Sequence, residues 1–140
     1  MKKLLMTLPL VLMTSTVMAI SAEDEKNYTQ NYQAQLKPLV VKQLSADRPE
    51  MTAAAVEMEA NAYVAKMASC QLKGLKLFPE NYQEKAILPV AQGADLSATT
   101  QALNAEMIKD IEAGTISKDA ATLLIQNAQE TVQICLNNKG

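Results

Sequence analysis

The chain of 140 residues has no histidine, no tryptophan, one phenylalanine and only four glycines. Histidine supplies the base for most serine and cysteine nucleophiles and is the commonest metal ligand. Its absence argues against an enzyme with such a nucleophile and against a metal site. The four glycines form no phosphate-binding loop and no dinucleotide fingerprint. We therefore expect a protein that is not an enzyme, with no catalytic residue, no cofactor and no metal site.

Positive charge is also scarce. The chain carries 13 lysines and arginines against 15 aspartates and glutamates, a formal net charge of −2. Removing Lys2 and Lys3 with a leader leaves 11 against 15, a net charge of −4. Nucleic acids and anionic membrane surfaces are bound through basic patches, so this balance argues against both. Uncharged glutamines are spread over the helical segments instead, which suits contact with another protein.

The first 22 residues are typical of a secretory signal peptide. Lys2 and Lys3 precede the apolar stretch Leu4–Met13, and small residues follow at the exit. A membrane-spanning helix needs about 20 apolar residues, roughly twice the length of this stretch. The sequence predicts cleavage after Ala19 or Ala22, a single mature domain at 23–140 with no membrane span, and a periplasmic or secreted location.

The expected location outside the cytoplasm bears on the state of the two cysteines. Cys70 and Cys135 are 65 residues apart, and an even cysteine count in an oxidising compartment indicates a disulfide. In the loop-entropy description, a crosslink of this span stabilises the fold by about 4 kcal/mol. We expect this bond to be the only covalent link between distant parts of the chain.

Apolar residues recur at helical spacing, and no segment alternates with period two, so the fold class is predicted to be all-α. A first helix covers 23–44, where Pro38 predicts a kink or break. The pair Tyr28 and Tyr32 should pack this helix down. Because of its proline and its acidic start, we expect it to be the least firmly docked helix.

Capping residues mark the starts of the later helices. Asp47–Glu50 reads as the start of a long helix that ends near Lys73, followed by a connector with a short helix at 80–87. Asp95 or Ser97 should cap the next helix, and Ser117 the last one.

A disulfide would constrain how these helices are arranged. Cys70 and Cys135 both lie near the C-terminal ends of their helices, so a bond between them predicts that the two helices run parallel. We expect a small helical bundle: a three-helix core made of the long helix and the last two, with the kinked N-terminal helix laid across it.

Two sets of residues are candidate sites for chemistry. Glu106 and Asp110 are one helical turn apart and could share a proton or hold a cation, but a solvated helix face with Lys109 is the interpretation we prefer. Thioether ligands suit Cu(I), yet the methionines of the mature chain lie on helical stripes where core packing is favoured. These methionines are Met51, Met58, Met67 and Met107.

The function predicted from the sequence is that of a small exported binding or interaction protein, chaperone-like or immunity-like (an inhibitor), whose partner is another protein. Its apolar helix faces, or a groove beneath the first helix and the connector, would form the binding surface. The alternative is a periplasmic carrier of a metal or small molecule.

Overall fold

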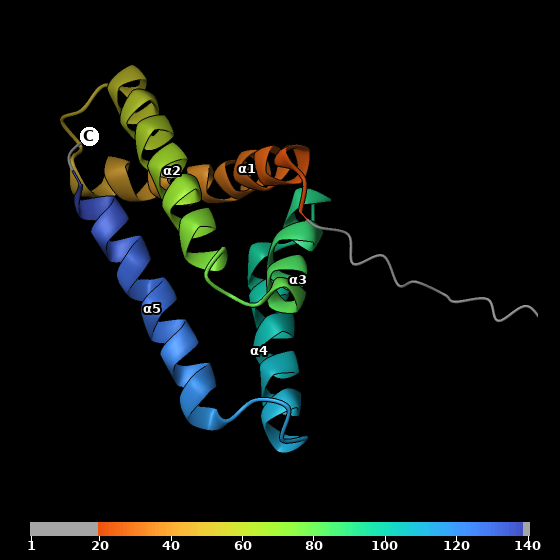
Figure 1. Ribbon diagram of the computed structural model, residues 1–140. Helices are drawn as coiled ribbons and strands as arrows, with labels where there is room; N and C mark the ends of the chain where they lie inside the picture. Colours follow the sequence, from red (N-terminus) through yellow and green to blue (C-terminus); the bar gives the residue numbers. More distant parts are fainter. Residues whose placement is uncertain (1–19, 139–140) are drawn as a thin grey trace, which may run out of the picture.

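The structure, a computed structural model, describes residues 20–138, and this part of the chain contains helices and no strands. Residues 1–19, which hold most of the predicted signal peptide, lie outside the described residues. Helix α1 lies against both α2 and α3, α2 also packs on α5, and α3 packs on α4 (Figure 1). The five helices are α1 (Ala22–Asp47), α2 (Ala53–Leu75), α3 (Glu80–Ala91), α4 (Leu96–Glu112) and α5 (Lys118–Asn137).

Side-chain caps explain where four of these helices begin. In each case a hydroxyl or carboxylate oxygen accepts a hydrogen bond from the backbone N–H three residues later, which satisfies one free donor of the first turn. The capping residues are Ser21, Thr52, Asp95 and Ser117. The expected cap at Ser117 is confirmed, and of the two alternatives for α4 the structure has Asp95.

The predicted cap at Asp47 is wrong. Asp47 is the last residue of α1, and α2 begins after Thr52. Proline restricts the residue before it to non-helical conformations, and Arg48, which precedes Pro49, has φ −134° and ψ 70°. The proline that was expected to open α2 therefore closes α1, and a turn separates the two helices.

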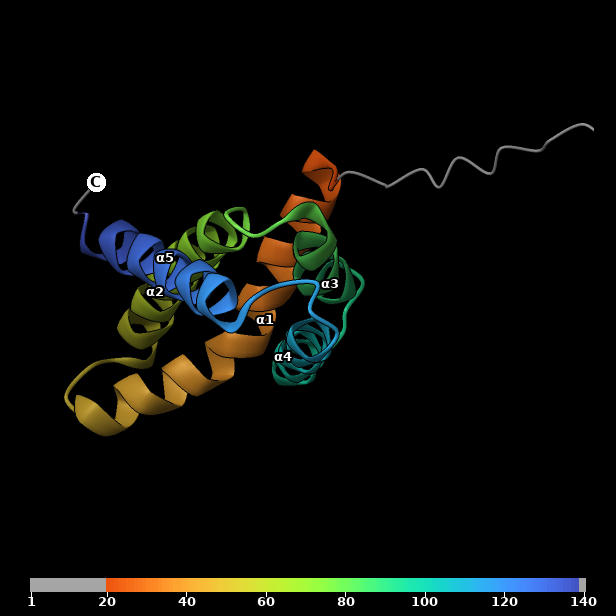
Figure 2. The same ribbon diagram turned by 60° about the horizontal axis from the view of Figure 1, so that its bottom comes forward.

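Helix α1 continues through Pro38, so the predicted break near Lys37 is absent, and a kink there is not confirmed. The carbonyl that Pro38 leaves without a partner belongs to Ala34, an exposed residue that water can reach. Tyr28 and Tyr32 are buried as expected, and α1 contacts both α2 and α3 (Figure 2).

Helix α2 buries a stripe at four-residue spacing: Val56, Ala60, Val64 and Ala68. Of the predicted core methionines, Met107 is buried and Met67 is partly buried against the core. The prediction for Met58 is wrong, because 72% of its surface is exposed. Its stripe, with Ala62 and Ala65, faces solvent because α1 and α5 cover the other sides of α2.

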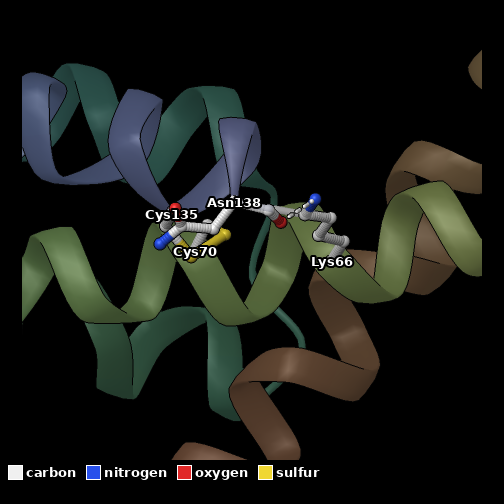
Figure 3. The surroundings of a disulfide bond; sticks show 4 residues. All are labelled: Lys66, Cys70, Cys135 and Asn138. Atoms are coloured by element: carbon white, nitrogen blue, oxygen red, sulfur yellow. Dashed lines mark hydrogen bonds between the residues drawn. A yellow bond between two sulfur atoms is a disulfide. The ribbon is translucent and has the colours of Figure 1, made fainter. Parts of the chain in front are cut away.

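The predicted disulfide between Cys70 and Cys135 is present, with Cα atoms 5.5 Å apart (Figure 3). The helices it joins are antiparallel, however, and the prediction that they run parallel is wrong. Before Cys70, the Lys66 ammonium donates to the Asn138 carbonyl oxygen at 2.9 Å. After Cys70, Gly74 lies against Ala128. Later residues of α2 therefore contact earlier residues of α5, as in an antiparallel pair.

A single crosslink fixes one point and leaves the direction of each helix open. Cys70 lies five residues before the end of α2, so α2 continues for more than one turn past the disulfide and packs against α5 there. At Gly74 the helices touch closely: an added Cβ would lie 3.0 Å from the Ala128 carbonyl oxygen and 2.8 Å from Val132 Cγ2. The three-helix core of α2, α4 and α5 is not what the structure shows, because α4 packs chiefly on α3.

Candidate binding cleft

The helices leave a cleft of about 830 Å³ whose walls are α4 and α5. These two helices diverge from the short turn that joins them and contact each other little (Figure 1). The floor comes from α1, α2, α3 and the inner faces of both walls. It is apolar and includes three aromatic rings; its buried residues include Tyr28, Tyr32, Phe78, Val90, Leu103 and Met107.

Two tyrosines of α1 form part of the floor. Tyr28 is 2% exposed, and its ring centre lies 5.8 Å from that of Tyr32, one helical turn away. Burial raises the pKa of the Tyr28 phenol far above its ordinary value, with the neighbouring Tyr32 adding to the effect. Burial likewise raises the pKa of Tyr32. Both phenols are therefore neutral at physiological pH.

Uncharged polar side chains form the rim. On α4 they are Ser97, Thr100, Gln101 and Asn104, and on the facing wall they are Gln129 and Gln133 of α5, all exposed. Each amide both donates and accepts hydrogen bonds. Among the described residues, no lysine, arginine, aspartate or glutamate lines the cleft. The cleft thus combines an apolar floor with two neutral, hydrogen-bonding edges.

The start of the α4 wall is tied to α1 by two amides one turn apart. The Asn31 side-chain N–H donates to the carbonyl oxygens of Val90 and Ala91, at 2.9 and 3.1 Å. Gln35 donates to the Ala94 carbonyl oxygen and accepts from the Leu96 backbone N–H, both at 2.9 Å. These bonds satisfy backbone groups at the end of α3 and the start of α4, so they fix the loop between them.

Farther along, α4 is held by α3. The Tyr82 hydroxyl donates to Asp110 Oδ2 at 2.6 Å, and Lys85 Nζ lies 2.5 Å from Glu106 Oε1. Glu106 and Asp110, which were interpreted as a solvated helix face, are half-buried, and each carboxylate has its own partner on α3. Burial raises the pKa of Tyr82 to about 12, and the hydrogen bond to Asp110 and its negative charge add to the shift.

The α5 wall is held by different contacts. The disulfide and the Lys66–Asn138 hydrogen bond attach its C-terminal end to α2 (Figure 3). Its N-terminal end follows the turn after α4, where Gly114 has a φ of +75° that other residues rarely adopt. The two walls therefore belong to separately anchored parts of the fold and are joined by one turn.

No family model, curated protein or solved structure matches this chain. Within residues 20–138, no helix is long and apolar enough to cross a membrane. Over the same residues, no three side chains of histidine, cysteine, aspartate or glutamate are grouped so that they could hold a metal ion.

The sequence located this cleft only in part. A groove beneath the first helix and the connector was expected, and α1 and α3 do contribute to the floor, but the walls are the last two helices. The rim residues could have been found from their spacing, since Ser97 and Gln101 are four residues apart, as are Gln129 and Gln133. What the sequence did not reveal is that the two rows face each other.

Proposed function

We propose that this chain is a non-catalytic binding protein, exported to the periplasm or secreted, and that the cleft between α4 and α5 is its binding site. Its partner is another protein, in a chaperone-like or inhibitor-like role. The observation that supports this proposal is the uncharged cleft of about 830 Å³ over an apolar floor. A large concave apolar surface with a few polar groups at its edge is the usual form of a binding site.

A second candidate function is that of a small-molecule carrier. The volume of the cleft lies within the range of about 300 to 1,000 Å³ that is typical of small-ligand pockets. The same apolar floor would accept a neutral organic molecule. For a metal carrier, no comparable arrangement of ligands was found among residues 20–138.

The binding site can be tested by filling it. Thr100 lies on the α4 rim, is exposed, and donates its hydroxyl to the carbonyl oxygen four residues earlier, at 2.9 Å. Thr122 on α5 makes the same kind of bond at 2.9 Å, is equally classed as exposed, and does not line the cleft. Thr100→Trp therefore places a bulky side chain at the cleft, and Thr122→Trp is its matched control.

The neutral apolar dye Nile red serves as the probe, titrated with each purified protein while its fluorescence is recorded. We expect binding to the parent protein and to Thr122→Trp, and an affinity at least about tenfold weaker for Thr100→Trp, a difference of about 1.4 kcal/mol. Equal affinities for the two variants, or no binding to the parent protein, would contradict the proposed site.

A further inference from the structure

We propose that the cleft binds an extended, uncharged apolar segment of another polypeptide, and that it holds this segment through the peptide backbone. This inference rests on the binding function proposed above and names its ligand. Three properties of the cleft lead to it: its lack of charge, the spacing of its rim, and the composition of its floor.

The lack of charge selects the kind of segment. A charged side chain drawn into the cleft would lose water without meeting an opposite charge, because no charged residue lines the cleft among the described residues. Free fatty acids and charged peptides are disfavoured for the same reason. An uncharged stretch, as occurs in the interior of a folded protein and becomes exposed on unfolding, pays no such penalty.

The rim matches the backbone of an extended chain. Side chains four residues apart on a helix are separated by about 6 Å along its axis. An extended chain presents N–H and C=O groups to the same side every second residue, at intervals of about 6.6 to 6.8 Å. Gln129 and Gln133 on the α5 wall have this spacing. On the facing wall the Gln101 amide donates to the Ser97 hydroxyl at 3.3 Å, so this pair offers a single joined polar group.

The hydrogen-bonding groups of the rim also favour an extended peptide over a helix or an acyl chain. Each amide of the rim can donate to a carbonyl and accept from an N–H, which are the two groups that every peptide unit of an extended segment leaves unpaired. A docked helix has already satisfied its backbone internally. An acyl chain has no groups along its length that could use the rim.

The floor accommodates the side chains. In an extended segment alternate side chains point to the same face, so every second residue would face Tyr28, Phe78, Leu103 or Met107. Aromatic rings offer large contact areas, and methionine adapts its shape to different partners. Recognition through the backbone over such a floor tolerates many sequences, which suits the chaperone-like role.

The test uses three labelled probes of eight residues with blocked ends, measured by fluorescence anisotropy. The first alternates leucine and serine. The second has the same sequence with N-methylated leucines, which removes half of the backbone donors and keeps the side chains. The third replaces two leucines with aspartate. Dodecanol, a neutral acyl chain, is added as a competitor.

We expect the first probe to bind, and the N-methylated and aspartate probes to bind at least about tenfold more weakly. Gln129→Leu combined with Gln133→Leu should weaken the first probe, and should weaken the N-methylated probe less, because that probe keeps only part of the backbone groups that the amides bind. Gln126→Leu, an exposed α5 residue outside the cleft lining, is the matched control and should behave as the parent protein.

The outcomes separate this inference from the function on which it rests. If the N-methylated probe binds as well as the first, or if dodecanol displaces the peptide at equal concentration, backbone recognition is refuted while the cleft remains a binding site. If Nile red and all the probes bind Thr100→Trp and the parent protein equally, the site itself is refuted.

An independent observation at the start of α1 points to where the signal peptide is removed. Ser21 and Asp24 form a reciprocal cap: the Asp24 backbone N–H donates to the Ser21 hydroxyl at 3.1 Å, and the Ser21 backbone N–H donates to Asp24 Oδ2 at 2.9 Å. This carboxylate bonding lowers the pKa of Asp24. Ile20 packs against the hydrophobic core.

Of the two predicted cleavage positions, only the one after Ala19 leaves Ile20 and Ser21 in the mature chain. Cleavage after Ala22 would remove the cap and the first residue of α1. We infer that export is followed by cleavage after Ala19. The intact mass and N-terminal sequence of protein recovered from the periplasm or medium test this: a chain that begins at Ile20 is expected, and one that begins at Glu23, or an uncleaved chain, would overturn it.

Discussion

Removing the disulfide should cost this protein a large part of its stability. We consider Cys70→Ala combined with Cys135→Ala, because Cys70 is only 1% exposed and alanine leaves no unpaired polar group there. The bond closes a loop across a separation of 65 residues. For a loop of this length, the entropy lost by the crosslinked unfolded chain corresponds to about 4 kcal/mol at 25 °C.

Urea unfolding followed by circular dichroism measures this cost. With a denaturant slope of about 2 kcal/mol per molar urea, a loss of about 4 kcal/mol lowers the unfolding midpoint by about 2 M. The parent protein treated with reductant should unfold at the same midpoint as the double variant, and the variant should not respond to reductant. We expect the variant to keep its helical signal in the absence of urea.

A loss of less than about 1 kcal/mol in both the variant and the reduced parent protein would refute this reasoning. It would mean that the unfolded chain is already compact enough for the crosslink to remove little freedom. Alkylation of two free thiols in the parent protein, without prior reduction, would refute the bond itself.

Three further predictions concern the helix contacts, each measured by urea unfolding. Gln35→Ala removes two hydrogen bonds from the α3–α4 loop and should destabilise the protein by about 1 to 3 kcal/mol. Gly74→Ala gains about 1 kcal/mol of helix propensity but forces a Cβ against the Ala128 carbonyl oxygen, where overpacking costs about 1 to 3 kcal/mol, so it should be destabilising by about 1 kcal/mol overall. The pKa of Tyr82 is raised to about 12 in the folded chain, against 10 for a free phenol. The stabilisation that the neutral phenol gives the folded state is therefore complete below pH 10 and is lost as the pH rises through 12. Tyr82→Phe should lose less stability than the parent protein between pH 10 and 12, and equal losses would contradict the assignment.

The features that could be predicted from the sequence are those governed by nearby residues. Ser117 caps a helix because its hydroxyl reaches an N–H three residues away, and that relation is visible in the sequence. The disulfide followed from the cysteine count and the expected compartment. The burial of Tyr28 and Tyr32 followed from their spacing on one helix face.

The features that could not be predicted depend on distant contacts. The direction of α5 relative to α2 is set by the close approach at Gly74, which the sequence alone presents only as a helix stop. Asn31 and Gln35 look like ordinary surface amides until α3 and α4 are placed beside them. The cleft requires both walls, so no single segment encodes it.

The anchoring of α5 at its far end also means that cutting the chain need not divide the molecule. The turn at 113–117 is mostly exposed and is the only backbone connection between α5 and the rest of the described fold. A protease that cleaved there would leave α5 attached through the disulfide, so the nicked protein would migrate as one species until a reductant split it in two. The same geometry lets α5 be supplied as a separate synthetic peptide and joined by oxidation, which would allow one wall of the cleft to be exchanged without altering the other.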